Sequence, residues 1–289
     1  MTDIKTGLTT LYAMFRQRGI DQTLLGVEKT DLISQCLERI PVPETIPHFL
    51  FEIPLCGIPR HDLILSVPSD LSGDLYQFYE FDLSENSSYP NSYLIPGRSY
   101  TMEHLFTYLR TQGEENRFRM LSEIFERAPG NWEPYYAILF SGRGAKSTRI
   151  SFKIRETNPA EEHKAFLNGL SGIGYTLPQG TMKEQLRAVL GNGIMTEVML
   201  DVLPDGQFGP VLGISRFRAG KEELSRLGIL SENYGIGDRR WRYINRMSFC
   251  GENNGVSCKT EFNSVKFRWD NGRMMPAKVY IKSVISEEN

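Results

Sequence analysis

The stretch VKFRWDNGRMMPAKVYIKSV, Val265 to Val284, holds two runs of alternating residues on either side of an Asp-Asn-Gly turn. A period of two that is interrupted by such a turn predicts a β-hairpin. Successive side chains of a strand point to opposite faces, so this hairpin has two chemically different sides. The apolar side carries Val265, Phe267, Trp269, Ala277, Val279 and Ile281, and the other side carries Lys266, Arg268, Lys278, Tyr280 and Lys282.

Similar two-sided hairpins are predicted along the rest of the chain, separated by segments with helical spacing. The hairpins cover 48–67, 132–156, 196–217 and 265–284, and the helical segments cover 5–19, 29–40, 101–127, 159–171, 181–190, 221–230 and 238–245. A polar stretch around SENSSYPNS is predicted to be a surface excursion. Hairpins that alternate with helices predict an α+β fold, in which an antiparallel sheet has its apolar face covered by helices. We expect a single domain over 1–289, built from one repeated α-β-β-α unit.

The composition narrows the class of protein. The chain has 289 residues, 40% of them hydrophobic, and its net charge of -2 leaves no global basic footprint for nucleic acid or an anionic membrane. Neither a signal peptide nor an apolar run long enough to span a membrane is present, so we expect a soluble cytoplasmic protein. The four cysteines and four histidines are irregularly spaced, which predicts neither a disulfide framework nor a protein-built metal site.

The polar faces of the strands allow two interpretations. In the first, they are the solvated outer face of an open antiparallel sheet, which is a common arrangement. In the second, roughly eight to ten strands close into a barrel and these faces line a lumen that can hold a ligand. Tyr280, a large aromatic residue between Lys278 and Lys282, favours the lumen, because a solvated face needs only small polar residues there.

A lumen rich in Lys and Arg predicts the binding of a polyanion such as a diphosphate. Aromatic faces beside it would stabilise a developing carbocation, and a lone carboxylate such as Glu52 would act as general base. The predicted chemistry is therefore transfer of an allylic cation from its diphosphate. The glycines of SGRGAKS join two strands, unlike those of a phosphate-binding loop, and the chain has no GxGxxG, GxSxG or DDxxD element.

These features resemble the ABBA-type prenyltransferases, and within them the cyanobactin peptide prenyltransferases, which have a similar length. The segment TRISFKIRETNPAEEHKAF resembles their basic strand and the helix that follows, and TEVMLDVLPDGQFG, VKFRWDNG and AKVYIK fit the same pattern. The resemblance implies an antiparallel barrel with a polar lumen and an outer ring of helices. The family has five hairpins, so a further pair is expected in YQFYEFDLS or in RMSFCGENN.

Roles for individual residues follow from this resemblance. Glu52 corresponds to the catalytic carboxylate, and Tyr280 to the aromatic wall that shields the cation. Tyr136 is a further wall candidate, although WEPYYAILF is apolar on both faces, so alternation does not say which way it points. Trp269 is a further wall candidate only if a bulge turns it inward, because strict alternation places it on the apolar side. The cations implied for the diphosphate are Arg149, Lys153, Arg268, Lys278 and Lys266, with Arg60 from a turn.

The resemblance implies a monomer that moves a dimethylallyl or geranyl group to a nucleophilic side chain of a ribosomal peptide natural product. Magnesium would bridge the diphosphate without a protein ligand set of its own, and neither nucleic acid nor a membrane is an expected partner. Two alternatives remain open. One is the same transfer to a small indole or phenol, and the other is a noncatalytic barrel that binds an anionic lipid or peptide. The acceptor residue and the donor length are also open.

Overall fold

The computed structural model describes residues 4–20, 22–26, 48–68, 75–81, 91–96, 115–139, 147–154, 158–178, 180–190, 196–217, 219–253 and 255–287. Several sequence predictions fall outside these ranges: the helix at 29–40, the first half of the helix at 101–127, most of the polar excursion and most of the glycine turn at 141–147.

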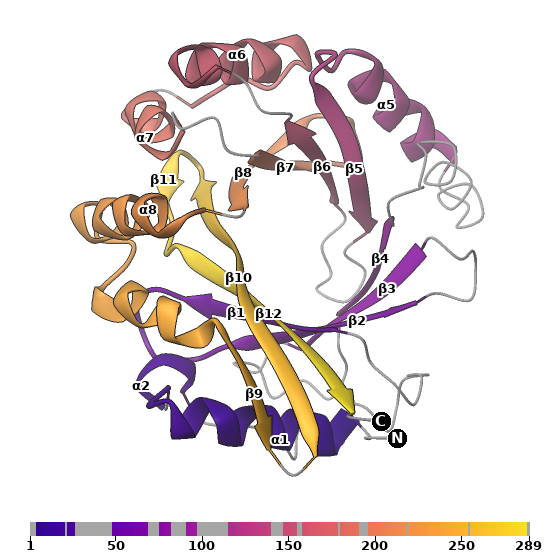
Figure 1. Cartoon of the computed structure of the whole chain (residues 1–289). Coiled ribbons are helices and arrows are strands. Elements are labelled where there is room, and N and C mark those ends of the chain that lie inside the picture. The colour runs from indigo at the N-terminus through magenta and orange to yellow at the C-terminus, as the bar shows by residue number, and fades with distance from the viewer. Residues whose placement is uncertain are drawn as a thin grey trace.

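The strands form one curled antiparallel sheet (Figure 1). Within the described ranges, ten strands follow one another in the order β4-β3-β2-β1-β12-β10-β8-β7-β6-β5, while β9 and β11 pair with β10 beside this path. The two strands at the ends of this order, β4 and β5, contact each other. The strands are β1 (His48–Pro54), β2 (Asp62–Pro68), β3 (Leu75–Phe81), β4 (Asn91–Pro96), β5 (Trp132–Leu139), β6 (Thr148–Ile154), β7 (Thr196–Val202), β8 (Phe208–Phe217), β9 (Phe249–Asn253), β10 (Val256–Asp270), β11 (Arg273–Met274) and β12 (Lys278–Glu287).

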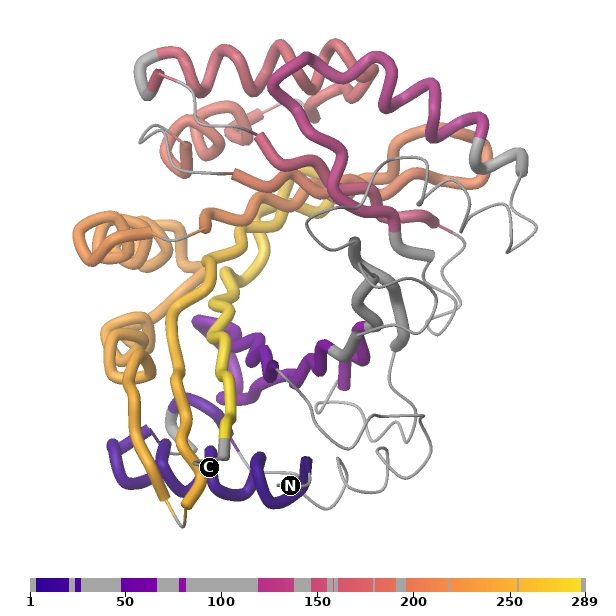
Figure 2. The backbone as a smooth tube through the Cα atoms, turned by 45° about the vertical axis from the view of Figure 1, so that its right-hand side comes forward, coloured from indigo at the N-terminus to yellow at the C-terminus, as the bar shows by residue number. Residues whose placement is uncertain are grey.

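The helices lie on the outer side of this curled sheet, as Figures 1 and 2 both show. Helical segments predicted at 5–19, 159–171, 181–190 and 221–230 are confirmed, whereas the segment predicted at 238–245 is a 3-10 helix. The described helices are α1 (Ile4–Gln17), α2 (Gln22–Leu25), α5 (Glu115–Glu126), α6 (Pro159–Gly172), α7 (Met182–Val189), α8 (Lys221–Asn233) and the 3-10 helix η1 (Arg239–Met247).

The hydrophobic core lies between the sheet and these helices. Alternate strand residues such as Phe51, Phe152 and Phe267 are fully buried in it, and the apolar side predicted for 265–284 belongs to the same cluster. Burial of each such side chain stabilises the fold by about 1.5–3 kcal/mol relative to exposure. The opposite side chains of the strands therefore face away from the helices, toward the inside of the curl.

The Asp-Asn-Gly turn has the geometry that its sequence predicts. Asn271 and Gly272 both have positive φ, at 50° and 75°, as a tight hairpin turn of the I′ type requires. The turn leads into the short strand β11, and β12 then continues the pairing with β10. The irregularity in β10 lies between Phe262 and Ser264, so the strand is regular at Trp269.

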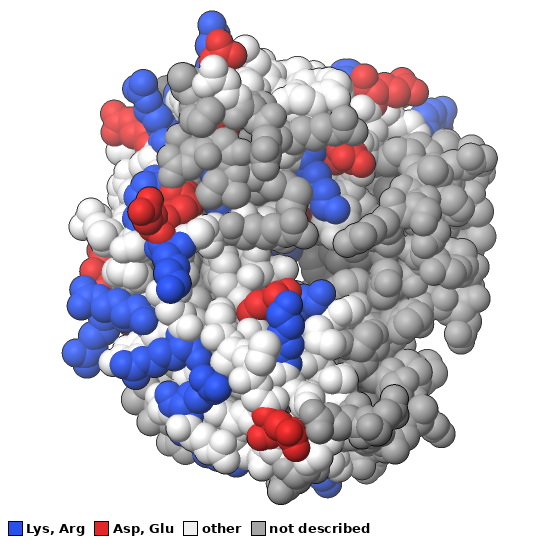
Figure 3. Space-filling view, viewed as in Figure 1, with Lys and Arg blue, Asp and Glu red and all other residues white. Residues whose placement is uncertain are grey.

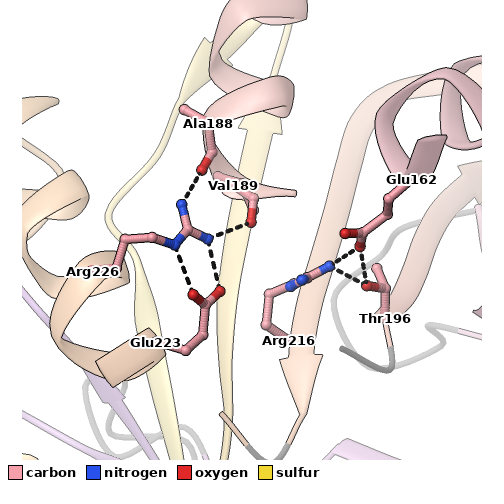
Figure 4. A network of polar contacts seen from close by, with 7 residues as sticks. All are labelled: Glu162, Ala188, Val189, Thr196, Arg216, Glu223 and Arg226. Atoms are coloured by element: carbon pink, nitrogen blue, oxygen red, sulfur yellow. Dashed lines mark hydrogen bonds and ion pairs between the residues drawn. The ribbon is translucent and has the colours of Figure 1, made fainter. Parts of the chain in front are cut away.

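Polar contacts attach the outer helices to one another and to the sheet (Figure 4). Arg226 of α8 donates from Nη1 to the carbonyl of Ala188 (2.6 Å) and from Nη2 to that of Val189 (3.2 Å), at the end of α7. Arg216 of β8 is fully buried and pairs with Glu162 of α6. These contacts satisfy carbonyls at the end of α7 and hold α6 against the sheet.

The regular α-β-β-α repeat is not confirmed. Only six residues separate β2 from β3, so β1 to β4 come in close succession, whereas later hairpins are separated by helices. Both segments proposed for the additional pair contain strand residues, since YQFYEFDLS holds all of β3 except Leu75 and RMSFCGENN holds β9. β3 pairs with β4, which begins at the end of the stretch that was predicted to be a surface excursion.

Candidate active-site cavity

A cavity of about 820 Å³ lies on the inner face of the curled sheet. Its walls come from the strand residues whose parity opposes the core, and from loops at 56–60 and 275–276. Among the described residues that line it, six are Lys or Arg and four are Asp or Glu. Eight of the ten predicted site residues line it: Glu52, Arg60, Tyr136, Arg149, Lys266, Arg268, Lys278 and Tyr280.

Trp269 does not line the cavity, so the inward bulge that would have made it a wall residue is not present and Trp269 is not part of the wall. Its side chain is fully buried in the core between sheet and helices. The indole Nε1–H donates to Oε1 of Gln185 on α7 at 2.8 Å. Because β10 is regular at this position, alternation places the indole on the side of its neighbour Phe267.

Lys153 also lies outside the lining. Its ammonium sits over the ring of Tyr135, 3.5 Å from the centroid, and burial lowers its pKa. An irregularity in β5 between Pro134 and Tyr136 explains why Tyr135 and Tyr136 both line the cavity although they are consecutive. The sequence alternation could not reveal Tyr135, because a bulge shifts the parity of the strand.

Glu52 has a donor on each of its two carboxylate oxygens. It is buried on β1, where Lys278 pairs with Oε1 and the hydroxyl of Tyr280 donates to Oε2. Both partners come from β12, which is hydrogen-bonded to β1 in register Glu52 to Tyr280. Glu52 is therefore held in one orientation by two donors from the neighbouring strand.

This environment keeps Glu52 ionised. Burial by itself would raise its pKa, but the charges of Lys278 and Lys266 and the hydrogen bonds from Lys278 and Tyr280 outweigh burial and lower the pKa to about 2. A carboxylate with such a pKa is a weak base. Glu52 acts as a fixed negative charge for as long as these cations remain beside it.

Lys266 is a lysine of the cavity wall that makes no ion pair in the described structure. It faces the ring of Tyr280, with Nζ 5.9 Å from the centroid, and within the described ranges it has no hydrogen bond or ion pair. Burial is the main reason why its pKa falls to about 8, and repulsion from Arg149 adds to this effect. An anion placed in the cavity would therefore gain a charge-assisted contact without first breaking an ion pair of Lys266.

Two of the arginines that line the cavity, Arg149 and Arg268, are paired to different extents. Arg149 makes a two-pronged contact with Asp201, with Nε at 2.8 Å from Oδ1 and Nη2 at 3.2 Å from Oδ2. Arg268 lies 3.7 Å from Asp270, and its buried Nε has no partner in the described structure. Arg268 therefore retains a buried donor that is directed to no other group.

Glu197 is a site residue that the sequence analysis did not select. It is buried on β7, it lines the cavity, and its Oε1 accepts a hydrogen bond from Ser151 at 2.5 Å. The strand registers place Lys278 beside Lys266, Lys266 beside Ser215, and Ser215 beside Glu197. Parity alone put Glu197 on the polar face, but only register shows that it shares a row with the two lysines.

The rim of the cavity is partly apolar. Ile58, in the loop between β1 and β2, has 83% of its surface exposed, and Met275 and Pro276 line the cavity from the segment before β12. The two segments are joined by a backbone hydrogen bond from Leu55 to the carbonyl of Ala277 at 2.8 Å. The exposed isoleucine thus sits on an anchored loop beside the cavity.

Comparisons with known proteins give no family for this chain. Neither a protein-family model nor a curated protein matches it. Among solved structures, it has a likeness to a conserved protein of unknown function with a hot dog fold from Alicyclobacillus acidocaldarius. That likeness has 10% identity over 89% of this chain and 85% of that one, with a TM-score of 0.13. A TM-score this low supports no argument about fold or function.

Two further observations concern metals and membranes. Within the described residues, no group of three His, Cys, Asp or Glu side chains is arranged to hold a metal ion. In the same ranges, no helix combines the length and the apolar character needed to cross a membrane.

Proposed function

We propose that the chain is an ABBA-type peptide prenyltransferase, which moves a dimethylallyl or geranyl group from its diphosphate to a nucleophilic side chain of a peptide. The observation that carries this proposal is the set of residues that line one cavity. It is lined by cations that have few or no ion pairs in the described structure, by tyrosine rings and by the oriented carboxylate of Glu52. Its volume of about 820 Å³ is in the range of roughly 300–1,000 Å³ that small-molecule sites have.

Closure of the sheet into a barrel is part of the proposal. The strand order is sequential when followed round the curl, from β5 through β12 and then from β1 to β4. β1 pairs with β12, and β4 contacts β5. A barrel of about ten strands leaves space inside for a ligand, and closure would exclude water from a reactive cation.

In this proposal the diphosphate binds to Lys266, Arg268 and Arg60 first, because in the described structure Lys266 and Arg60 have no ion pair and Arg268 has only a long one, at 3.7 Å from Asp270. Lys278 and Arg149 complete the site by exchanging part of their contact with Glu52 and Asp201 for phosphate oxygens. Magnesium, when bound with the diphosphate, would neutralise part of its charge. Three of the four carboxylates that line the cavity, Glu52, Glu197 and Asp201, already have a protein donor in this structure.

The reaction assigned to this site is a displacement at the allylic carbon. The carbon–oxygen bond of the donor breaks, and its electron pair leaves with the diphosphate. The rings of Tyr280, Tyr135 and Tyr136 face the developing cation. The acceptor lone pair then bonds to carbon, and the acceptor proton moves to Glu52. Glu52 becomes a better base at this stage, because the diphosphate has drawn the charge of Lys278 away from it.

A peptide acceptor is favoured by the rim. Ile58, Met275 and Pro276 give an apolar surface beside the cavity, and such a surface suits the side chains that flank a reactive residue. A small indole or phenol would need contacts inside the cavity alone.

The proposal is tested by incubating the protein with magnesium, dimethylallyl or geranyl diphosphate, and a panel of cyclic and linear peptides beside free indoles and phenols. Mass spectrometry should show addition of one prenyl group to a peptide. Addition only to the small aromatics would overturn the peptide acceptor. No addition at all, together with tight diphosphate binding, would indicate a noncatalytic binder.

The matched variant is Glu52→Gln, which keeps the shape of the side chain and removes its charge. An enzyme of the proposed kind should lose turnover by about 100-fold or more while still binding inorganic diphosphate. Unchanged turnover in this variant would remove Glu52 from the mechanism.

A further inference from the structure

The 3-10 helix η1 carries an arginine-rich sequence that the proposed reaction does not use. Arg239, Arg242 and Arg246 are exposed on it, and exposed Arg18 lies over the ring of Phe249, just beyond its C-terminal end, at 4.0 Å from the centroid. We call these four residues the arginine patch. Figure 3 shows Lys and Arg gathered on the lower left of the molecule, in the region where η1 lies in Figure 1.

Few carboxylates neutralise the arginine patch. Glu232 of α8 accepts from Nε1 of Trp241 at 2.9 Å and lies 3.5 Å from Arg242. Asp238 pairs with Arg240, which is buried and does not belong to the patch. Within the described ranges, the other three members of the patch have no ion pair. An otherwise nearly neutral chain thus presents a local positive surface.

The aromatic residues of η1 narrow the class of ligand. Trp241 packs against α8 so closely that a Cβ at Gly228 would lie 2.2 Å from its ring, and Arg242 sits 5.7 Å from its centroid. Arg246 lies 5.0 Å from the centroid of Tyr243. Single-stranded nucleic acid needs open aromatic faces for base stacking, and membrane docking needs exposed apolar side chains, whereas both rings are engaged. The planar forks of the arginines still match carboxylates.

The patch is continuous with the rim of the cavity. The backbone N–H of Asp238 donates to the carbonyl of Leu55 at 2.7 Å, and Nη2 of Arg240 donates to that of Gly57 at 2.9 Å. These two bonds fasten the start of η1 to the loop that carries Gly57, Ile58 and Arg60 into the cavity lining. A polypeptide that leaves the cavity over this loop reaches η1 next.

We propose that the arginine patch binds an acidic segment of the acceptor polypeptide while the acceptor residue occupies the cavity, an inference that rests on the proposed peptide acceptor. A 3-10 helix rises about 2.0 Å per residue, so the patch members Arg239 and Arg246 are roughly 14 Å apart along it. About four residues of extended chain cover that distance. An acidic segment of about four residues is therefore long enough to contact the arginines of η1.

Binding is measured first, without turnover, by fluorescence anisotropy of a labelled Glu/Asp-rich peptide titrated with the full chain at low and high ionic strength. The triple variant Arg239→Gln, Arg242→Gln and Arg246→Gln should weaken binding about tenfold, and salt should weaken it in the parent. The matched control is Lys164→Gln, Lys183→Gln and Arg187→Gln on α6 and α7. It removes the same charge from exposed positions and should change binding less than twofold.

Equal losses in the two triple variants would overturn the proposal, because they would show attraction by net charge alone. Patch-dependent binding of a labelled oligonucleotide or of anionic vesicles, without binding of the acidic peptide, would overturn it as well. With prenyl transfer as readout, an acidic tract beside the acceptor residue should lower KM about tenfold without changing kcat, and the patch variant should abolish that advantage. A protein that binds the acidic peptide but adds no prenyl group to any acceptor would contradict the proposed function and not the patch.

Discussion

Glu52 on β1 and Lys278 on β12 form an ion pair that runs diagonally between neighbouring strands. The residue directly opposite Glu52 is Tyr280, whose hydroxyl donates to the second carboxylate oxygen, and Lys278 itself lies opposite Pro54. Two residues of β12 that lie two positions apart thus each supply a donor to one buried carboxylate. This arrangement fixes where the negative charge of the cavity sits, and the behaviour of Glu52 follows from it.

The pH dependence of folding should report the Glu52 contacts. Its pKa is lowered to about 2 in the folded protein, from an ordinary value near 4.5, so the contacts stabilise the fold above about pH 4.5. This stability is lost as the pH falls from about 4.5 through about 2. In urea unfolding, the free energy of unfolding of the parent should fall by roughly 3 kcal/mol over this interval. That of Glu52→Gln should not show this fall. Parallel pH profiles of the two proteins would contradict the assignment.

Replacing Lys266 by Met should stabilise the protein and weaken binding at the proposed diphosphate site. Burial lowers the pKa of Lys266 to about 8, so holding it protonated in the fold is unfavourable below about pH 8. Because the side chain is partly exposed to the cavity, we expect a gain of about 1–2 kcal/mol at pH 7, which vanishes as the pH rises from about 8 toward 10.5.

Thermal unfolding would measure the gain in stability, and calorimetry with inorganic diphosphate should show affinity reduced about tenfold or more. The control is Lys183→Met on the exposed side of α7, which should change neither quantity. A Lys266→Met protein that binds diphosphate as the parent does would show that this lysine lies outside the anion site.

Tyr280→Phe should test whether the hydroxyl positions Glu52. The change keeps the ring in the cavity wall but leaves Oε2 of a buried carboxylate without its donor, which costs about 1–3 kcal/mol of stability. Loss of this hydrogen bond raises the pKa of Glu52, so the acid limb of the pH–rate profile should move to higher pH.

In the same variant kcat should fall about tenfold while inorganic diphosphate binds with unchanged affinity. Tyr280→Leu would remove the ring as well and should lower kcat further. If Phe at this position leaves the pH–rate profile where it was, the hydroxyl has no positioning role and Tyr280 is only part of the wall.

Gly169→Ala should loosen the contact between α6 and β5. A Cβ at Gly169 would lie 2.4 Å from Cζ2 of buried Trp132, so helix and strand would have to separate. We expect a loss of about 1–3 kcal/mol in denaturant unfolding. Gly130→Ala is the matched change, because a Cβ there meets nothing within 4 Å and the backbone has no positive φ. Equal stabilities of the two variants would be inconsistent with tight helix packing.

The regular strands were the most predictable part of the fold. The positions Lys266, Arg268, Lys278 and Tyr280 were assigned to one face from alternation alone, and all four line the cavity. The misses have different causes. Tyr135 enters the lining through an irregularity in β5, whereas Lys153 has the expected parity on the regular strand β6 and lies over the ring of Tyr135 without lining the cavity itself. Trp269 follows the alternation into the core, against the idea that a bulge would turn it inward.

By itself, the sequence determined which side chains of each strand share a face, because the pleat alternates with a period of two whatever the strand pairs with. The tertiary structure decided which faces meet and which charges are paired. Glu52 and Lys278 are 226 positions apart, and their contact depends on the register between the first and the last strand. Lys266 and Arg149 both carry their charge on the inner face of the sheet. Only the curvature and register of the sheet give Arg149 an ion pair with a carboxylate and leave Lys266 without an ion pair in the described structure.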